Sequence, residues 1–238
     1  MPVPVPRPAP DLSHPDLSHI DLSCIDTWVF DLDNTLYRAD VSFFADIGEK
    51  MTGFISRHLA LQPDEARRLQ EEYFHDYGAT LSGLMDVHGM DPAPFLDYVH
   101  DVDLSVLTPS PALRDAIAAL PGRRIVFTNG SRGHYRNVAD HLNLLDLFEG
   151  GFAIEDMDYQ PKPKRAAYDR FVGAYDFDPT RAIFFEDTRR NLEVAKEMGM
   201  TTVWIAGRDA WPGAKDGAGD FVDAVTDDLA GWLRAALG

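Results

Sequence analysis

An apolar run near the start of the chain ends in two aspartates, and this feature constrains the fold most. The segment Thr27–Phe30 is typical of a buried strand, and Asp31 and Asp33 follow it directly. Sites in α/β proteins form at the carboxyl ends of strands, so both side chains are expected at the mouth of a sheet. Two carboxylates this close repel each other, and a bound cation is the usual reason to hold them together. The alternative is a strand that runs into an Asp/Asn turn, because these side chains bond to the local backbone.

Strands and helices alternate along the chain after Thr108-Pro109. This alternation predicts an α/β fold with a doubly wound parallel sheet. The predicted helices cover residues 111–120, 133–144, 164–175, 188–198 and 227–237, and the predicted strands cover residues 124–127, 151–154, 182–185 and 202–205.

A helical block interrupts this pattern straight after the first strand. Between Val41 and about His100, apolar residues recur at helical spacing, and Pro63 followed by two acidic residues opens a second helix. We therefore divide the chain into a core of residues 25–38 and 107–238 and an all-helical insert of residues 39–106. An insert at this point would lie over the end of the first strand, above the two aspartates.

The first 24 residues are predicted to form a flexible tail. Residues 1–10 are rich in proline, which favours extended or disordered chain. Residues 11–25 repeat a five-residue pattern that is too short for a solenoid. His14 and His19 within this repeat are poor evidence for a metal, because a flexible segment offers no preformed site.

Composition limits the partners and the compartment. The chain has 238 residues and a net charge of -17, which argues against nucleic-acid polymers and anionic membranes but leaves a small anionic substrate open. No apolar run approaches the roughly 18 residues of a membrane span, and no secretory signal is visible. The single cysteine, Cys24, fits a reducing cytoplasm. We expect a cytoplasmic protein with no membrane contact and no obligate protein partner.

A second polar segment follows the strand at 124–127. It reads Thr128-Asn129-Gly130-Ser131, and a hydroxyl with exposed backbone amides at a helix start suits an oxyanion. The alternative is an ordinary strand-to-helix turn with Ser131 as the N-cap residue, and both interpretations are compatible.

Two more polar segments are candidates for the same site. Prolines flank Lys162, and its ammonium would offset negative charge on an anionic substrate. The alternative is that this segment is a solvated loop. Lys164 is a second candidate for the same role. The strand at 182–185 ends in Glu186 and Asp187, where the alternative is capping of the next helix. Parallel strands share their carboxyl edge, so these groups can converge.

Taken in order, these segments resemble the four motifs of the haloacid dehalogenase-like (HAD) superfamily. The resemblance covers residues 27–206 and implies a Rossmann-like α/β core, with the insert similar to the superfamily's helical C1 cap. Finer features resemble the pyrimidine 5'-nucleotidase branch. The residues that carry the resemblance are Asp31–Tyr37, Thr128-Asn129, Lys162-Pro163 and Glu186-Asp187 for the superfamily, and Asn34, Tyr37, the pair 186–187 and residues 77–84 for the branch.

The resemblance implies a role for each aspartate. Asp31 would attack phosphorus and form an aspartyl-phosphate, and Asp33 would protonate the leaving alkoxide and then activate water. Mg2+ would bind the carboxylates of Asp31 and Asp187 and the backbone carbonyl of Asp33, because hard oxygen ligands suit it.

The same resemblance assigns the surrounding groups. Thr128 and the backbone amide of Asn129 would hold phosphoryl oxygens, with Gly130 as a further substrate contact. Lys162 would balance charge between nucleophile and phosphate, and Glu186 would act from outside the ligand shell. One position departs from the family pattern: Asn191 stands where many members have Asp, which leaves it an outer contact rather than a direct ligand.

The expected function is Mg2+-dependent hydrolysis of a small phosphomonoester, with a pyrimidine nucleoside 5'-monophosphate as the substrate and Tyr37 and Tyr77 as leaving-group contacts. The alternative is a phosphatase for phosphoglycolate or a sugar phosphate; a mutase and a non-catalytic binding protein also stay open. Dehalogenases of the superfamily lack an acid/base residue at the position of Asp33. A phosphonate hydrolase would need an insert lysine for a Schiff base, and Lys50 lies on an ordinary helix face.

Overall fold

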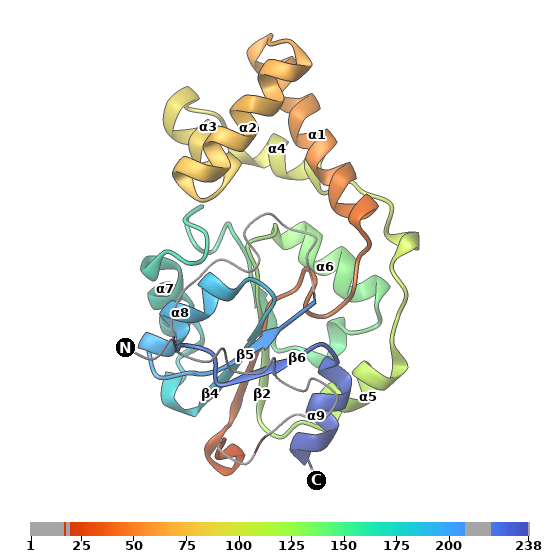
Figure 1. Ribbon diagram of the computed structural model, residues 1–238, viewed down its shortest axis with the longest axis vertical. Coiled ribbons are helices and arrows are strands. Elements are labelled where there is room, and N and C mark those ends of the chain that lie inside the picture. Colours follow the sequence, from red (N-terminus) through yellow and green to blue (C-terminus); the bar gives the residue numbers. More distant parts are fainter. Residues whose placement is uncertain (1–16, 18–19, 208–219, 238) are drawn as a thin grey trace, which may run out of the picture.

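Six parallel strands form one sheet in the computed structural model, which describes residues 17, 20–207 and 220–237 (Figure 1). The spatial order is β3-β2-β1-β4-β5-β6. The chain therefore runs outward from β1 in one direction, then returns beside β1 and runs outward in the other. The bounds are β1 Thr27–Phe30, β2 Arg123–Phe127, β3 Gly150–Phe152, β4 Ala182–Glu186, β5 Thr201–Ile205 and β6 Ala224–Thr226.

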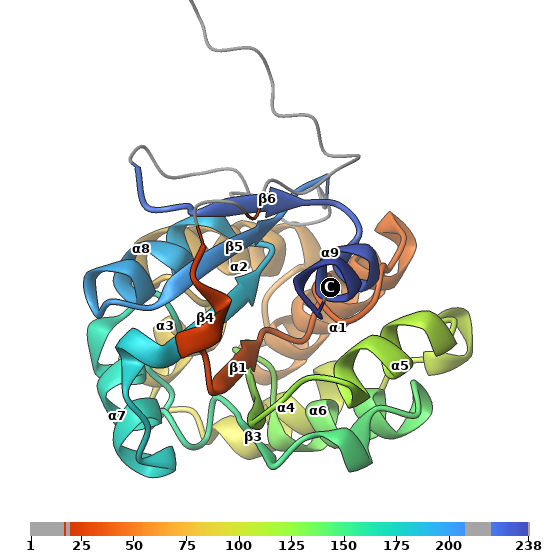
Figure 2. The same ribbon diagram turned by 90° about the horizontal axis from the view of Figure 1, so that it is seen from below.

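Helices cover both faces of this sheet (Figure 2). One face carries α5 (Pro111–Ala118), α6 (Arg132–His141) and α9 (Leu229–Leu237), and the other carries α7 (Arg165–Tyr175) and α8 (Arg189–Glu197). The central strand β1 is buried on both sides, so its residues alternate between the two cores: Trp28 and Phe30 face one, and Val29 faces the other. The doubly wound parallel sheet predicted from the sequence is confirmed.

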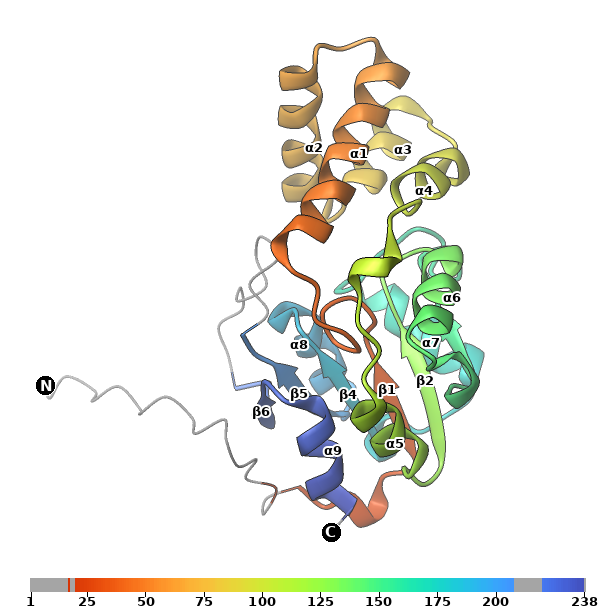
Figure 3. The same cartoon turned by 90° about the vertical axis from the view of Figure 1, so that its right-hand side faces the viewer.

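Four helices between β1 and α5 stand above the carboxyl edge of the sheet (Figures 1 and 3). They are α1 (Val41–Leu59), α2 (Pro63–Tyr77), α3 (Thr80–His88) and α4 (Pro92–Val99). The predicted start of the second helix is confirmed, because Pro63 occupies the first turn of α2. Helix α1 is capped by the carboxylate of Asp40. We call these four helices the insert. The predicted boundaries at residues 39 and 106 stay a prediction.

Helix α1 belongs to two hydrophobic clusters. Phe43, Phe44 and Ile47 in its first half pack into the sheet core, whereas Ile55 packs into a cluster of the insert. In the opposite direction, Ile154 from the loop after β3 packs into the insert cluster. These shared contacts attach the insert to the core directly above the strand ends.

The structure differs from the sequence prediction mainly at short elements. Strand β6 was not predicted, because three residues are too few to show alternation and the strand is defined only by its pairing with β5. Short 3-10 turns at Leu22–Cys24 (η1), Leu104–Val106 (η2), Leu145–Leu147 (η3) and Pro179–Arg181 (η4) were also missed.

Most of the predicted tail lies outside the described residues, and so does most of the five-residue repeat with His14 and His19. The described part of that segment includes η1, and Leu17, Ile20, Leu22 and Cys24 pack against the core. Within the described part of the chain, no helix is long and apolar enough to cross a membrane.

Candidate active site

Three neighbouring strands end level with one another at the carboxyl edge. Phe30 of β1 pairs with Val126 of β2 on one side and with Phe185 of β4 on the other. The amide of Asp31 continues this ladder and donates to the Phe185 carbonyl at 2.9 Å. The register therefore brings the first, second and fourth sequence motifs to one point, as parallel pairing predicts.

The chain turns immediately after Asp31. The amide of Leu36 donates to the Leu32 carbonyl at 3.0 Å, and both leucine side chains are buried in the core. Asn34 adopts the left-handed conformation with φ of 60°, which Asn tolerates better than most residues. The Asp/Asn turn considered as an alternative is thus present, and it is the element that carries Asp33.

Lys162 binds three oxygens at the centre of the site. Its Nζ lies 2.8 Å from Asp31 Oδ1, 2.7 Å from Glu186 Oε2 and 2.7 Å from the Phe127 carbonyl oxygen, so all three ammonium protons have acceptors. The side chain is 1% exposed. Burial alone would lower the pKa of Lys162, but Asp31 and Glu186 outweigh it and raise the pKa.

The loop around Lys162 is fixed by Asn129. The Lys162 amide donates to Asn129 Oδ1 at 2.8 Å, and Asn129 Nδ2 donates back to the Lys162 carbonyl at 3.2 Å. Asn129 thus uses its side chain to hold the loop, which leaves only its backbone amide for a substrate. Lys164, the rival lysine, is exposed at the start of α7.

Three buried carboxylates gather around one point. Asp31, Glu186 and Asp187 each offer an oxygen, and these oxygens lie within 4.8 Å of one another. Burial, then Glu186, raises the pKa of Asp31 to about 8, and burial followed by the charges of Glu186 and Asp31 raises the pKa of Asp187. One lysine cannot neutralise three carboxylates at this spacing.

The donor set fits a divalent cation. Asp187 Oδ2 is buried and has no hydrogen-bond partner among the described residues, and all ligand atoms on offer are hard oxygens. A cation would satisfy this oxygen and supply the missing positive charge. The predicted metal ligands Asp31 and Asp187 belong to this cluster, and Glu186 is its third member.

The segment after β2 forms a tight polar turn. Thr128 Oγ1 accepts from the Gly130 amide at 2.9 Å, and Ser131 caps α6 by accepting from the His134 amide at 3.1 Å. A Cβ at Gly130 would lie 3.2 Å from Thr128 Oγ1 and 3.4 Å from Asp33 Oδ2. A side chain at this position would therefore crowd the turn against Asp33.

The residues predicted to lie outside the ligand shell are both buried. One carboxylate oxygen of Glu186 accepts a hydrogen bond from Lys162, and the other accepts from the Thr188 amide at 3.0 Å. These two bonds fix the orientation of the Glu186 side chain. Asn191 lies on α8, its carbonyl accepts from the Tyr168 hydroxyl, and its Oδ1 has no partner among the described residues.

The two predicted leaving-group contacts are placed differently. The Tyr37 hydroxyl donates to Asp33 Oδ1, and its ring meets Phe43 edge-on with centroids 6.0 Å apart. Tyr77 ends α2 and packs edge-on against Tyr73, with centroids 5.5 Å apart. Tyr37 therefore lies in the site itself, and Tyr77 lies in the insert cluster.

Sequence reasoning missed two histidines at the site. His134 Nε2 lies 2.7 Å from Asp33 Oδ1, and the ring of His100 stacks on the ring of His134 with centroids 4.5 Å apart. Burial alone would raise the pKa of Asp33, but His134 and the hydrogen bond from Tyr37 lower it. The only sequence signal was that His134 falls in the first turn of the helix after Thr128. Helical periodicity does not show that this side chain contacts Asp33, which lies 101 positions earlier in the chain.

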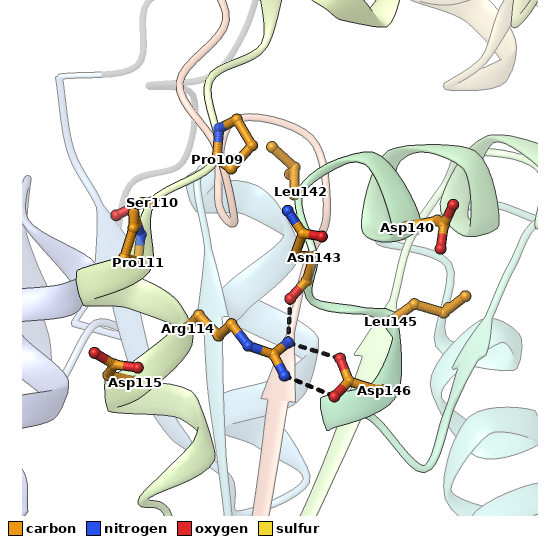
Figure 4. A pocket seen from close by; sticks show the side chains of 10 residues that line it. All are labelled: Pro109, Ser110, Pro111, Arg114, Asp115, Asp140, Leu142, Asn143, Leu145 and Asp146. Carbon is orange, nitrogen blue, oxygen red and sulfur yellow. Dashed lines mark hydrogen bonds and ion pairs between the residues drawn. The ribbon is translucent and has the colours of Figure 1, made fainter.

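A surface pocket of about 610 Å³ lies elsewhere, between α5 and the end of α6 (Figure 4). Arg114 occupies its floor and binds both Asp146 oxygens at 2.6 and 2.7 Å and the Asn143 carbonyl. None of the predicted site residues lines it. This pocket is therefore separate from the candidate active site.

The sheet order, the inserted helices and the polar strand ends define a doubly wound α/β core with its candidate site at the carboxyl edge. The family model for haloacid dehalogenase-like hydrolases matches residues 25–199. The chain belongs to this family of hydrolases.

Known proteins similar to the chain agree with this assignment. Phosphate metabolism protein 8 of Saccharomyces cerevisiae is 27% identical over 197 residues, which are 72% of this chain and 58% of that protein. The chain thus spans less than two thirds of that relative's length.

Solved structures share the fold. A HAD phosphatase from Thermococcus onnurineus has a TM-score of 0.62 at 20% identity, over 90% of this chain and 98% of that chain. L-2-haloacid dehalogenase from Xanthobacter autotrophicus has a TM-score of 0.58 at 20% identity, over 90% of this chain and 99% of that chain. At these identities the likeness shows the fold alone.

Proposed function

We propose that this hydrolase is a Mg2+-dependent phosphomonoesterase that acts on pyrimidine nucleoside 5'-monophosphates through an aspartyl-phosphate. One observation carries the proposal: two adjacent carboxylates have different partners. Asp31 is bound by Lys162 at 2.8 Å, whereas Asp33 is bound by His134 at 2.7 Å and by Tyr37. Different environments suit different chemical roles for two carboxylates.

In the first half-reaction, a carboxylate oxygen of Asp31 attacks phosphorus, and the bond from phosphorus to the leaving oxygen breaks. Asp33 gives that oxygen a proton. The proton that Asp33 gives up here is replaced in the second half-reaction, when Asp33 takes a proton from water.

In the second half-reaction, Asp33 takes a proton from water while the water oxygen attacks phosphorus. The bond to Asp31 breaks, and inorganic phosphate leaves. Thr128 and the backbone amide of Asn129 hold the phosphoryl oxygens, with Gly130 beside them. Lys162 offsets negative charge on Asp31 and the phosphoryl group throughout.

Mg2+ would be held by the carboxylates of Asp31 and Asp187 and by the backbone carbonyl of Asp33. When bound, it would supply Lewis-acid stabilisation of negative charge on the phosphoryl oxygens. Glu186 is held by Lys162 and by the Thr188 amide, and it would fix the surroundings of these ligands, with Asn191 further out.

The substrate assignment is the finest part of the proposal. The resemblance of Tyr37 and residues 77–84 to the pyrimidine nucleotidase branch supports it, and the Saccharomyces cerevisiae relative is named for phosphate metabolism. The single cysteine, which excludes an internal disulfide, supports a cytoplasmic setting.

The test is a kcat/KM panel of pyrimidine and purine mononucleotides, phosphoglycolate and sugar phosphates, measured with Mg2+ and with a chelator. We expect the highest kcat/KM for a pyrimidine mononucleotide, no turnover with chelator, and no turnover in Asp31→Asn. Asp115→Asn, an exposed aspartate on α5, is the matched control and should behave as the wild type. A preference for phosphoglycolate or a sugar phosphate would refute the nucleotide assignment, and an active Asp31→Asn would refute the mechanism.

A further inference from the structure

Asp33 is held on one oxygen only. Its Oδ1 accepts from the Tyr37 hydroxyl and lies 2.7 Å from His134 Nε2, while no described residue donates a hydrogen bond to Oδ2. A carboxylate oxygen has two lone pairs, so both positions on Oδ1 are taken. A proton arriving at Asp33 must therefore sit on Oδ2, which faces the turn at Gly130, where a Cβ would lie 3.4 Å away.

His134 is itself held from two sides. It lies 2% exposed in the first turn of α6, where its amide donates to Ser131 Oγ at 3.1 Å. Its ring is stacked on the ring of His100, at an interplanar angle of 23°. The imidazole therefore has little freedom to rotate away from Asp33.

His100 comes from the insert, where it is the C-cap residue of α4, and its Nδ1 lies 2.9 Å from Ser131 Oγ. Ser131 Oγ already accepts from the His134 amide, so its hydroxyl proton is free to point at His100. Burial and the neighbouring His134 lower the pKa of His100 to about 3, so its ring is neutral near pH 7 and its Nδ1 can accept that proton.

We propose that His134 is a positioning residue for Asp33, and that His100 of the insert holds His134 in place. Asp33 then presents Oδ2 to the leaving oxygen only while the insert is docked on the core. His134 donates its Nε2 proton to a hydrogen bond throughout and transfers none. This inference rests on the proposed function, because it assigns Asp33 the acid/base role.

The chain path supports this coupling. Only two connections join the insert to the core, and each carries a member of the network: Tyr37 precedes α1, and His100 follows α4. Each connection therefore contributes a residue to the surroundings of Asp33. Tyr37 contacts its carboxylate directly, and His100 contacts His134, which in turn contacts Asp33.

The experiment compares two esters that differ in the need for an acid. The nitrophenolate of p-nitrophenyl phosphate leaves without a proton, whereas an alkoxide needs one, and kcat/KM reports the half-reaction in which the leaving group departs. For His134→Ala we expect about a 10- to 100-fold loss in kcat/KM on the best primary-alkyl phosphate and a loss under about threefold on the nitrophenyl ester. His134→Gln, which places an amide N–H near the position of Nε2, should recover part of the loss.

His141→Ala is the matched control. His141 lies on the same helix, two turns further on, and its Nε2 donates to the Leu107 carbonyl at 2.9 Å, away from Asp33. We expect its ratio of kcat/KM values for the two esters to equal that of the wild type. A general loss of folded protein would lower both esters equally, so the ratio separates positioning from folding.

The role of His100 is tested with a double-mutant cycle on the alkyl ester. If His100 acts through His134, the double variant His100→Ala/His134→Ala loses no more than His134→Ala alone. His100→Phe, which retains the stacked ring, should lose less than His100→Ala.

Three outcomes overturn the inference, and they separate it from the proposed function. Equal losses on both esters for His134→Ala, or additive losses in the cycle, would refute the positioning role while leaving the phosphatase intact. A wild type that hydrolyses neither ester with Mg2+ would refute the proposed function and this inference together.

Discussion

At the scale of single residues, Lys162 allows two buried carboxylates, Asp31 and Glu186, to lie side by side. A buried ammonium that loses its partners would be costly, and so would buried carboxylates that lose the ammonium. Asp31 and Glu186 both depend on this one side chain for a charged hydrogen bond. Lys162 therefore contributes to the integrity of the site as well as to any charge stabilisation during the reaction.

Lys162→Met should lower the free energy of unfolding by about 3–5 kcal/mol at neutral pH, because two buried carboxylates lose their cation. Activity should fall at least about a hundredfold. The loss of stability should shrink as the pH falls, since the orphaned carboxylates can then take up protons. Urea unfolding and a phosphatase assay measure both quantities.

Lys164→Met is the matched control, because Lys164 lies two positions away and is exposed. We expect a stability change within about 0.5 kcal/mol and near-normal activity. Similar effects in the two variants would contradict the central position of Lys162.

His100 gives the molecule a specific dependence on pH. Its pKa is lowered by burial to about 3 in the folded chain, against an ordinary value of about 6.5. Between these values the unfolded chain binds one proton more than the folded chain, so stability is complete above the ordinary value and falls as the pH drops. His134 and Asp33 are the charged or titratable groups that act on it most.

His100→Phe should therefore lose less stability than the wild type between pH 7 and pH 5.5, by about 1 kcal/mol. Thermal unfolding of both proteins at the two pH values measures the difference. Parallel pH dependence in the two proteins would show that His100 is not neutral in the folded state.

At the scale of elements, the insert contains one especially close contact between α2 and α3. Tyr73 of α2 lies against Gly83 of α3, where a Cβ would come 2.4 Å from the ring, and its hydroxyl lies 2.9 Å from His88 Nε2. Gly83 is thus required by the packing of the two helices. Tyr73 is buried and belongs to the hydrophobic cluster of the insert.

Gly83→Ala should lower the free energy of unfolding by about 1–3 kcal/mol, because the methyl group must displace Tyr73. Gly173→Ala on α7 is the opposite case: nothing lies within 4 Å of its Cβ position, and alanine should stabilise the helix by about 0.5–1 kcal/mol. Equilibrium unfolding monitored by circular dichroism should give opposite signs. A stabilising Gly83→Ala would contradict the tight α2–α3 contact.

At the scale of the whole molecule, a net charge of -17 opposes compaction, and the site adds buried carboxylates to it. General screening by salt and specific binding of a cation should therefore both stabilise the protein. The two effects can be distinguished experimentally, because only specific cation binding depends on the carboxylates at the strand ends.

Added NaCl should raise the melting temperature by screening. MgCl2 at the same ionic strength should raise it further, because an ion that binds only the folded state stabilises it. Asp187→Asn should remove the additional effect of Mg2+ and retain the effect of NaCl. Equal responses of wild type and variant to Mg2+ would place the cation elsewhere.

Local sequence predicted much of the fold and part of the site. Short apolar strands that end in acidic or hydroxyl residues predict a parallel sheet with polar groups at one edge. Asp31 and Thr128 do follow paired strands, and Glu186 is the last residue of one. The helical insert was visible from its periodicity. Strand β6 was not visible, because its identity depends on a neighbour rather than on its own pattern.

The sequence by itself determined the sheet, the insert and the set of polar strand ends, because strand and helix periodicities and the parallel connection rule are local properties. The family resemblance favoured Lys162 over its rival Lys164, and the tertiary structure supplied the physical reason: Lys162 is buried against Asp31, whereas Lys164 is exposed. The tertiary structure alone placed His134 beside Asp33 and His100 beside His134, since these contacts join residues far apart in the sequence and the second depends on how the insert packs on the core.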